Sequence, residues 1–263
     1  MLLPHLKIKS EIVPAFVLLP GDPARVDIIG KQLKDFKIIQ QNREFRIGIG
    51  FYKKIKILVC STGIGCPSTA IAVEELIDSG ATVLIRIGTC GGSWKKNIPN
   101  GSFIIPQACI RDEGTTLEYI PLGFPATADI DIINALKKSS DVNNKNSFVG
   151  INRTHDAFYG SQNSITKWGE YLFDEKWKNY DTPILSSDME CSALFVVALL
   201  KGAKAGAILL ANANPEPLIE RLNKNKQEVI TELDQKKTKG YSKKLIKVTL
   251  EAIEILSKNH AFS

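Results

Sequence analysis

Three arginines in short turn-like segments are the residues of this chain best suited to bind an anion. They are Arg25 in 21–25 (GDPAR), Arg43 in 42–45 (NREF) and Arg86 in 86–92 (RIGTCGG). The first and third segments each follow an apolar run that predicts a buried strand. A glycine turn at the carboxyl end of a strand is where an open α/β sheet places its ligand. Since glycine lets the backbone approach that ligand and arginine grips phosphate through two parallel bonds, we predict a pocket for phosphate or a phosphate ester.

Two carboxylates stand at the start of another apolar run, 187–195 (SDMECSALF). A buried acid is costly unless it is paired, so Glu190 needs a partner, and the vicinal hydroxyls of a sugar would provide one. The alternative is structural, because Ser187 or Asp188 can cap the following helix, whose dipole favours acids at this end. Capping explains Asp188 fully and Glu190 only in part.

The segment 61–68 (STGIGCPS) lies between a predicted strand and a predicted helix and invites a dinucleotide-binding interpretation. It departs from that fingerprint, because Ser68 occupies the third glycine position. The next strand also ends in Arg86 and glycines instead of an acidic residue for a ribose. A tight strand–helix turn and a small-ligand loop remain as interpretations.

The elements that position these segments alternate between strand and helix, which favours a layered α/β fold. Strands are predicted at 16–19, 55–60, 82–87, 102–110, 148–152 and 205–210, and helices at 23–33, 68–78, 130–138, 189–200 and 242–256. The least structured parts are expected at 141–146 and 215–240, the latter with a weak helix at about 220–234. Since no repeat or linker divides the chain, we expect a single domain over 1–263.

The composition is that of a soluble globular protein, with 44% hydrophobic and 24% charged residues and a net charge of +6. The densest basic stretch, 236–244, adjoins acids, which favours a solvated helix face over a nucleic-acid groove. No apolar stretch approaches 18 residues, so we expect no membrane association and a cytoplasmic location. The five cysteines lack metal-ligand spacing, and we expect buried, reduced thiols and no metal site.

Taken together, the segments 21–25, 61–65, 86–92 and 188–190 occur in an order and spacing that resembles the nucleoside phosphorylase family. This branch holds the hexameric purine nucleoside phosphorylases and the uridine phosphorylases, and the resemblance runs from His5 to about Leu210. It implies an α/β fold, a single three-layer αβα domain with a mixed, partly barrel-like central sheet. It also implies phosphorolysis: a nucleoside and phosphate give a free base and a pentose 1-phosphate. Inorganic phosphate is then a co-substrate, and no further cofactor is expected.

The resemblance assigns roles by position. The expected phosphate shell is Gly21, Arg25, Arg86 and Thr89, joined by Arg43 from across a dimer interface. The expected ribose contacts are Met189, Glu190 and His5, with Glu190 on the 2′- and 3′-hydroxyls and the neighbour's histidine on the 5′-hydroxyl. Arg86 and Glu190 are the expected catalytic residues, and Asp188 stands where many relatives have Glu. A homo-oligomer follows, expected to be a hexamer built of dimers.

For the base, residues 158–162 (FYGSQ) resemble the uridine phosphorylase segment in which an aromatic packs on the base and a glutamine reads uracil. Phe158 and Gln162 are therefore expected at the base, with plain loop packing as the alternative for Phe158. Ser164 replaces an arginine expected in uridine enzymes. Asn212, or Ala213 if the alignment slips by one residue, replaces the aspartate that acts on the purine N7, and neither residue can serve as a general acid. We expect uracil ahead of a 6-oxopurine.

Two other functions remain to be weighed. A nucleosidase would use water in place of phosphate, but relatives of that kind lack the arginine cage that Arg25, Arg43 and Arg86 form. A non-catalytic nucleoside-binding protein of the same fold would explain the altered base site, but not the retained sugar and phosphate residues. His155, near the base segment, is expected to be a surface or structural histidine.

Overall fold

The computed structural model describes residues 2–91, 98–99, 101–158, 184–211 and 235–258, with the backbone alone for 235–242. The described residues form a ten-stranded mixed sheet in the order β2-β3-β4-β1-β5-β10-β6-β8-β9, with β7 paired to β6. The strands are β1 (Phe16–Pro20), β2 (Lys34–Asn42), β3 (Phe45–Tyr52), β4 (Ile55–Cys60), β5 (Val83–Cys90), β6 (Phe103–Asp112), β7 (Ala126–Thr127), β8 (Ser147–His155), β9 (Ile184–Asp188) and β10 (Lys204–Ala211).

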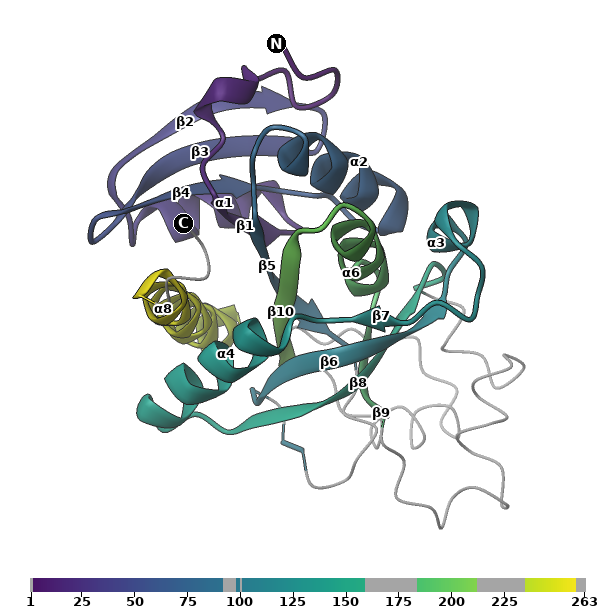
Figure 1. The fold of residues 1–263 in the computed structure, drawn as a ribbon. Coiled ribbons are helices and arrows are strands. Elements are labelled where there is room, and N and C mark those ends of the chain that lie inside the picture. Colours follow the sequence, from purple (N-terminus) through teal and green to yellow (C-terminus); the bar gives the residue numbers. More distant parts are fainter. Residues whose placement is uncertain (1, 92–97, 100, 159–183, 212–234, 259–263) are drawn as a thin grey trace, which may run out of the picture.

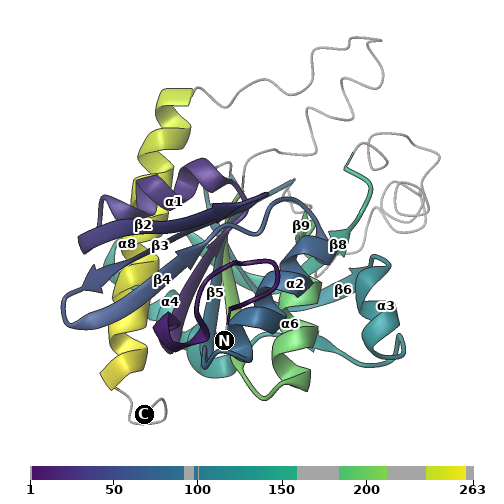
Figure 2. The ribbon, with the colours of Figure 1, turned by 90° about the horizontal axis from the view of Figure 1, so that it is seen from above.

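Helices cover both faces of this sheet (Figures 1 and 2). They are α1 (Pro23–Gly30), α2 (Cys66–Ile77), α3 (Thr115–Tyr119), α4 (Ile130–Val142), α6 (Cys191–Leu200) and α8 (Gln235–Lys258), with a short 3₁₀ turn at Ser10–Ile12. One apolar core joins α2 and α6 to the sheet, and a second joins α1, α4 and α8 to the opposite face. The expected three-layer α/β architecture is confirmed.

The sheet curls on itself at the end that carries the predicted ligand segments. Strands β4, β1, β5 and β10 run parallel, so their carboxyl ends lie at one edge. Strands β6, β8 and β9 continue the sheet, and an isolated bridge between Gly91 and Ser187 returns β9 to the end of β5. This closure makes the central sheet partly barrel-like, as expected, and brings segments from distant parts of the chain together.

Side-chain alternation along the strands decides which face each residue serves. In β5, Leu84 packs in the α2/α6 core, while Val83, Ile85 and Ile87 pack in the core on the other face. Arg86 therefore points to the α2/α6 face. This is the face on which α6 begins directly after β9.

Three sequence expectations on element boundaries need correction. Helix α1 ends at Gly30 rather than at residue 33, because glycine is a weak helix former and the Phe36 ring packs against it. Helix α4 runs to Val142, into the segment 141–146 expected to lack structure. Helix α8 starts at Gln235, so the last part of 215–240 is helical. The weak helix at 220–234 lies outside the described residues.

The five cysteines are free and buried, as expected. Burial raises the pKa of each of four of these thiols, that of Cys90 to about 12. None of the helices in the described ranges is both long and apolar enough to cross a membrane.

Candidate active site

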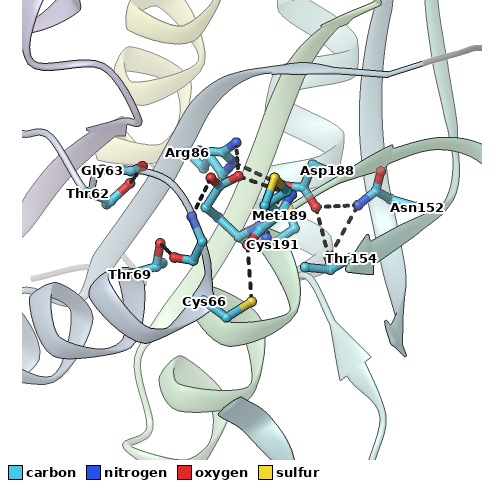
Figure 3. Close-up of polar contacts among 12 residues, drawn as sticks. Thr62, Gly63, Cys66, Thr69, Arg86, Asn152, Thr154, Asp188, Met189 and Cys191 are labelled. Atoms are coloured by element: carbon cyan, nitrogen blue, oxygen red, sulfur yellow. Dashed lines mark hydrogen bonds and ion pairs between the residues drawn. The ribbon is translucent and has the colours of Figure 1, made fainter. Parts of the chain in front are cut away.

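Arg86 lies at the centre of the candidate site, near the carboxyl end of β5, and is only 5% exposed. Its guanidinium donates from Nε to Asp188 Oδ2 at 3.1 Å and from Nη2 to Glu190 Oε2 at 2.5 Å. Burial alone would lower the pKa of Arg86, but these two carboxylates outweigh it and raise it. The arginine predicted from a glycine turn and the two acids predicted from a helix start form one buried cluster (Figure 3).

Glu190 links this cluster to the glycine loop after β4. Its Oε1 accepts the backbone N–H of Gly65 at 2.9 Å, and its Oε2 also accepts the N–H of Met189 at 3.2 Å. Burial raises the pKa of Glu190, while Arg86 acts in the opposite direction. The partner that the sequence required for Glu190 is thus Arg86. A sugar hydroxyl as a second partner of Glu190 stays a prediction.

Both carboxylate oxygens of Asp188 accept hydrogen bonds from the protein itself (Figure 3). Its Oδ1 accepts from Asn152 Nδ2 and Thr154 Oγ1, both at 2.8 Å, and its Oδ2 accepts the N–H of Cys191, the first residue of α6, at 3.0 Å. Asp188 thus accepts from the first N–H of α6 as a capping residue would, although the N-cap position itself is Glu190, which makes no side-chain capping bond. With Arg86 also on Oδ2, the acceptor positions of Asp188 are used, so it orients Arg86 and the start of α6.

One nitrogen of Arg86 has no partner among the described residues. Nη1 is buried and unbonded, and a side chain on Gly21 would come within 3.8 Å of it. Gly88 is far more restricted than Gly21, because a Cβ there would meet Arg86 Cζ at 2.9 Å and Leu209 Cδ2 at 2.8 Å. Gly88, which lies within β5 and not in the predicted turn, therefore gives the guanidinium its room. A buried N–H donor without a partner is costly, which indicates that a ligand atom completes it.

Arg25 and Thr89 line a pocket on the α1/α8 side of β5. Gly88 also lines this pocket, and its other walls are apolar: Ile28, Ile29, Ile87, Leu210, Leu245 and Ile246. The pKa of Arg25 is lowered, first by burial and then by the positive charge of Arg86. Two like charges brought together around free donors favour an anion between them. The structure thus places Gly21 and Arg25 near Arg86, whereas Thr89 faces the other side of β5 and its phosphate contact stays a prediction.

Arg43 lies in the turn between β2 and β3, with an exposed side chain and a φ of 54°. The left-handed region costs a non-glycine residue about 1 kcal/mol or more, and Arg43 shares it with Lys7, Asp35, Lys53 and Asn144. The residue after Arg43 anchors the turn, since Ser61 Oγ donates to the carbonyl of Glu44 at 2.5 Å. Arg43 thus stands beside the glycine loop that holds Glu190. Its phosphate contact across a dimer interface stays a prediction.

His5 is not part of the Arg86 cluster in the described residues. Its Nδ1 lies 2.6 Å from Glu75 Oε1 on α2, and its carbonyl accepts from Asn42 Nδ2 at 2.7 Å. The ring is about half exposed, 48%. Its role at a neighbour's sugar stays a prediction.

Most of the residues expected to bind the base lie outside the described part of the chain. Phe158 follows β8 and is 50% exposed, while Gln162, Ser164 and Asn212 lie outside the described residues. His155 ends β8 and is buried, so it is structural rather than a surface residue. Burial, followed by the charge of Arg153, lowers its pKa. Within the described ranges, no three His, Cys, Asp or Glu side chains gather as a metal ion would require.

Sequence reasoning missed the residues that support the cluster. Asn152 and Thr154 alternate along β8 and so share the face on which Asp188 lies. Ser186 Oγ in turn donates to Asn152 Oδ1 at 2.8 Å. Polar residues two apart in a buried strand were the available signal, because such residues need partners. Glu75, a buried acid on an otherwise apolar helix face, was a second such signal.

The arrangement provides fixed cationic donors next to a fixed carboxylate, all out of water. The donors suit a phosphate, and Glu190 suits hydroxyls or a developing positive charge. Charge stabilisation by preorganised groups in a dry site is usually the largest contribution to catalysis.

A family model described as the phosphorylase superfamily matches residues 15–254, and the chain belongs to this superfamily. Its relatives are nucleoside phosphorylases, which are pentosyltransferases. A guanosine phosphorylase of Halorubrum lacusprofundi is 34% identical over 96% of this chain and 98% of its own length. A uridine phosphorylase of Treponema pallidum is 37% identical over 80% of this chain and 81% of its own length. A crystal structure of uridine phosphorylase from Vibrio fischeri superimposes with a TM-score of 0.80 at 31% identity, covering 95% of this chain and 96% of that one.

Proposed function

We propose that this protein catalyses the phosphorolysis of a nucleoside, giving a free base and a pentose 1-phosphate. The observation that carries the proposal is the different use of the three guanidinium nitrogens of Arg86. Two of its nitrogens bind Asp188 and Glu190, and the third, Nη1, is buried beside Gly21 with no partner in the described part of the chain. One side chain is thus shared between the carboxylate suited to the sugar and the position suited to phosphate.

The reaction follows from this geometry. A phosphate oxygen attacks the anomeric carbon while the C–N bond breaks, and the electron pair of that bond leaves with the base, which takes up a proton. Positive charge develops on the sugar, as in glycoside hydrolysis. The phosphate and the Glu190 carboxylate stabilise it, and Arg86 holds both anions in place. Holding phosphate and sugar together also removes the entropy cost of a bimolecular encounter.

For the base we propose uracil, on the resemblance of residues 158–162 to the uridine-enzyme segment. A 6-oxopurine is the second candidate, favoured by the guanosine phosphorylase that matches 96% of the chain. Asn212 would then read the purine O6/N7 edge as an amide. We further propose that the enzyme works in the cytoplasm as a hexamer built of three dimers.

The deciding experiment is a panel of uridine, inosine and guanosine, each with and without inorganic phosphate, followed by release of free base. We expect release to require phosphate and to yield a sugar 1-phosphate. Equal turnover in phosphate-free buffer would mean a hydrolase, and binding without turnover would mean a nucleoside-binding protein. In the same panel Gln162→Ala should depress uridine cleavage by about 10- to 100-fold, because it leaves polar atoms of the base unpaired. Good cleavage of inosine or guanosine but none of uridine would overturn the uracil assignment.

A further inference from the structure

Among the described residues outside the Arg86 cluster, Glu75 has a carboxylate whose two oxygens both accept hydrogen bonds. This residue lies on α2 and is buried, with 9% of its surface exposed. Its Oε1 accepts the backbone N–H of His5 at 2.8 Å, and its Oε2 accepts that of Leu6 at 2.9 Å. The third partner is the ring of His5, whose Nδ1 lies 2.6 Å from Oε1. A single acid therefore fixes both the backbone and the ring of His5.

The three partners determine which ring nitrogen carries the proton. A carboxylate only accepts hydrogen bonds, so Nδ1 of His5 must be the donor. In the neutral imidazole, Nε2 is then left as a hydrogen-bond acceptor. Since the side chain of His5 is about half exposed, its ring can be reached by a group from outside the subunit. The partner that Nε2 accepts from must itself be a donor, such as a hydroxyl.

The same corner of the fold carries Arg43. Asn42 donates to the carbonyl of His5 and directly precedes Arg43 in the β2–β3 turn. The N-terminal segment and this turn lie together beside α2, at the β2 edge of the sheet (Figure 1). Both residues expected at a neighbour's site are thus presented from one surface, and Glu75 is the group that holds His5 there.

We propose that Glu75 is a positioning residue that fixes the tautomer of His5, so that Nε2 accepts a hydrogen bond from the free 5′-hydroxyl of a nucleoside in the neighbouring site. The inference rests on the proposed function and narrows its substrates to nucleosides with a free 5′-hydroxyl. A 5′-deoxy nucleoside lacks the donor, and a 5′-phosphate or 5′-thioether puts an acceptor against an acceptor.

The kinetic test compares the nucleoside that the panel selects with its 5′-deoxy analogue. Glu75→Gln places an amide N–H₂ against either His5 Nδ1 or the N–H of Leu6, so it disturbs the ring or its anchor. We expect a loss of about 10-fold in kcat/KM with the 5′-hydroxyl substrate and less than about twofold with the analogue. The matched control is Glu74→Gln on the same helix, which loses a pair with Lys201 but does not touch His5. Equal losses on both substrates, or no loss, would overturn the proposal.

Two further measurements separate positioning from mere stabilisation. If Glu75 acts through His5, the double variant His5→Ala/Glu75→Gln has the kcat/KM of His5→Ala alone. Imidazole nitrogen shifts of ¹⁵N-histidine-labelled protein, assigned with His5→Ala, should show protonated Nδ1 and bare Nε2 at His5. A wild-type enzyme with protonated Nε2 would overturn the inference alone. A wild type that releases no base with phosphate would overturn the proposed function and, with it, the sugar partner of His5.

Discussion

At the scale of single residues, Glu190 is the group on which the sugar chemistry depends. Glu190→Gln keeps the shape and the bond from Gly65 but removes the charge that pairs with Arg86 and favours a cationic sugar. We expect kcat/KM to fall by about 10²-fold or more, roughly 3 kcal/mol. Steady-state kinetics with Glu118→Gln, an exposed glutamate on α3, as control would check this. A loss below about threefold would assign Glu190 a structural role only.

The pH dependence of Glu190 follows from its burial. Burial raises its pKa above the ordinary 4.5, and only the ionised form can pair with Arg86 and stabilise positive charge. As the pH falls, Glu190 therefore takes up its proton earlier than an exposed glutamate, and kcat/KM falls with it. The expected acid limb lies above pH 4.5 and is absent from the profile of Glu190→Gln. A limb of the same position and depth in the variant would exclude Glu190 as its source.

Asp188 is expected to behave differently from Glu190, because its oxygens are already occupied by Asn152, Thr154, Arg86 and Cys191. Asp188→Asn puts an N–H₂ group against donors and leaves Arg86 with half its support. We expect the free energy of unfolding to fall by about 3 kcal/mol and phosphate KM to rise, measured by denaturant unfolding and kinetics. Asp141→Asn, at an exposed pair with Lys137, is the control. Unchanged stability with a raised nucleoside KM would instead make Asp188 a sugar ligand.

At the scale of elements, the close packing of β5 against Arg86 is testable at Gly88. A methyl group there would lie 2.9 Å from Arg86 Cζ and 2.8 Å from Leu209 Cδ2, so the guanidinium must move. We expect Gly88→Ala to raise phosphate KM by about 10-fold or more, because small displacements of positioning groups are costly. Gly123→Ala, which meets open space, should leave KM unchanged. Identical phosphate KM values for the two variants would mean that Arg86 is not confined by β5.

The elements that carry the site were largely predictable, and the reasons for the exceptions are physical. Strand β4 and the end of β1 follow from apolar runs bounded by glycine. Strand β5 instead continues through Gly88 to Cys90, past its predicted end at residue 87, and β9, which carries Asp188, was not predicted. Strand β3 gives no such apolar signal, because Gly48 and Gly50 look like strand breakers. In the fold, Gly48 makes room for the Phe36 ring, since a Cβ there would lie 2.2 Å from it. A glycine that serves packing across a sheet cannot be told from one that ends a strand without knowing its neighbour.

Contacts between elements were harder to predict than the elements themselves. Arg86 and Glu190 are 104 positions apart, and nothing local pairs them. The sequence indicated that Glu190 needs a partner, and we expected a sugar hydroxyl. In the structure the curled sheet brings Arg86 to Glu190 as that partner. The bridge from Gly91 to Ser187 creates that proximity. The chemistry of single segments could thus be predicted from the sequence. The contacts between segments could not, because they depend on the order of the strands in the sheet.

At the scale of the whole molecule, His5 is bound to Glu75 and not to the Arg86 cluster, which predicts that one subunit completes another's site. The smallest active unit is then a closed two-fold dimer, in which each subunit gives His5 and receives it. Sedimentation at assay concentration should show no active monomer.

Co-expression of two defective chains tests this exchange directly. His5→Ala subunits keep Glu190, and Glu190→Gln subunits keep His5, so a mixed dimer holds one intact site and one doubly defective site. Random pairing makes about half of the dimers mixed, so about a quarter of wild-type activity should return. If His5 instead served its own chain, each subunit would keep its own defect, and the mixture would show only the average of the two variants. Co-expressed Glu118→Gln with Glu190→Gln controls for dilution, since its activity reflects the unaffected sites alone.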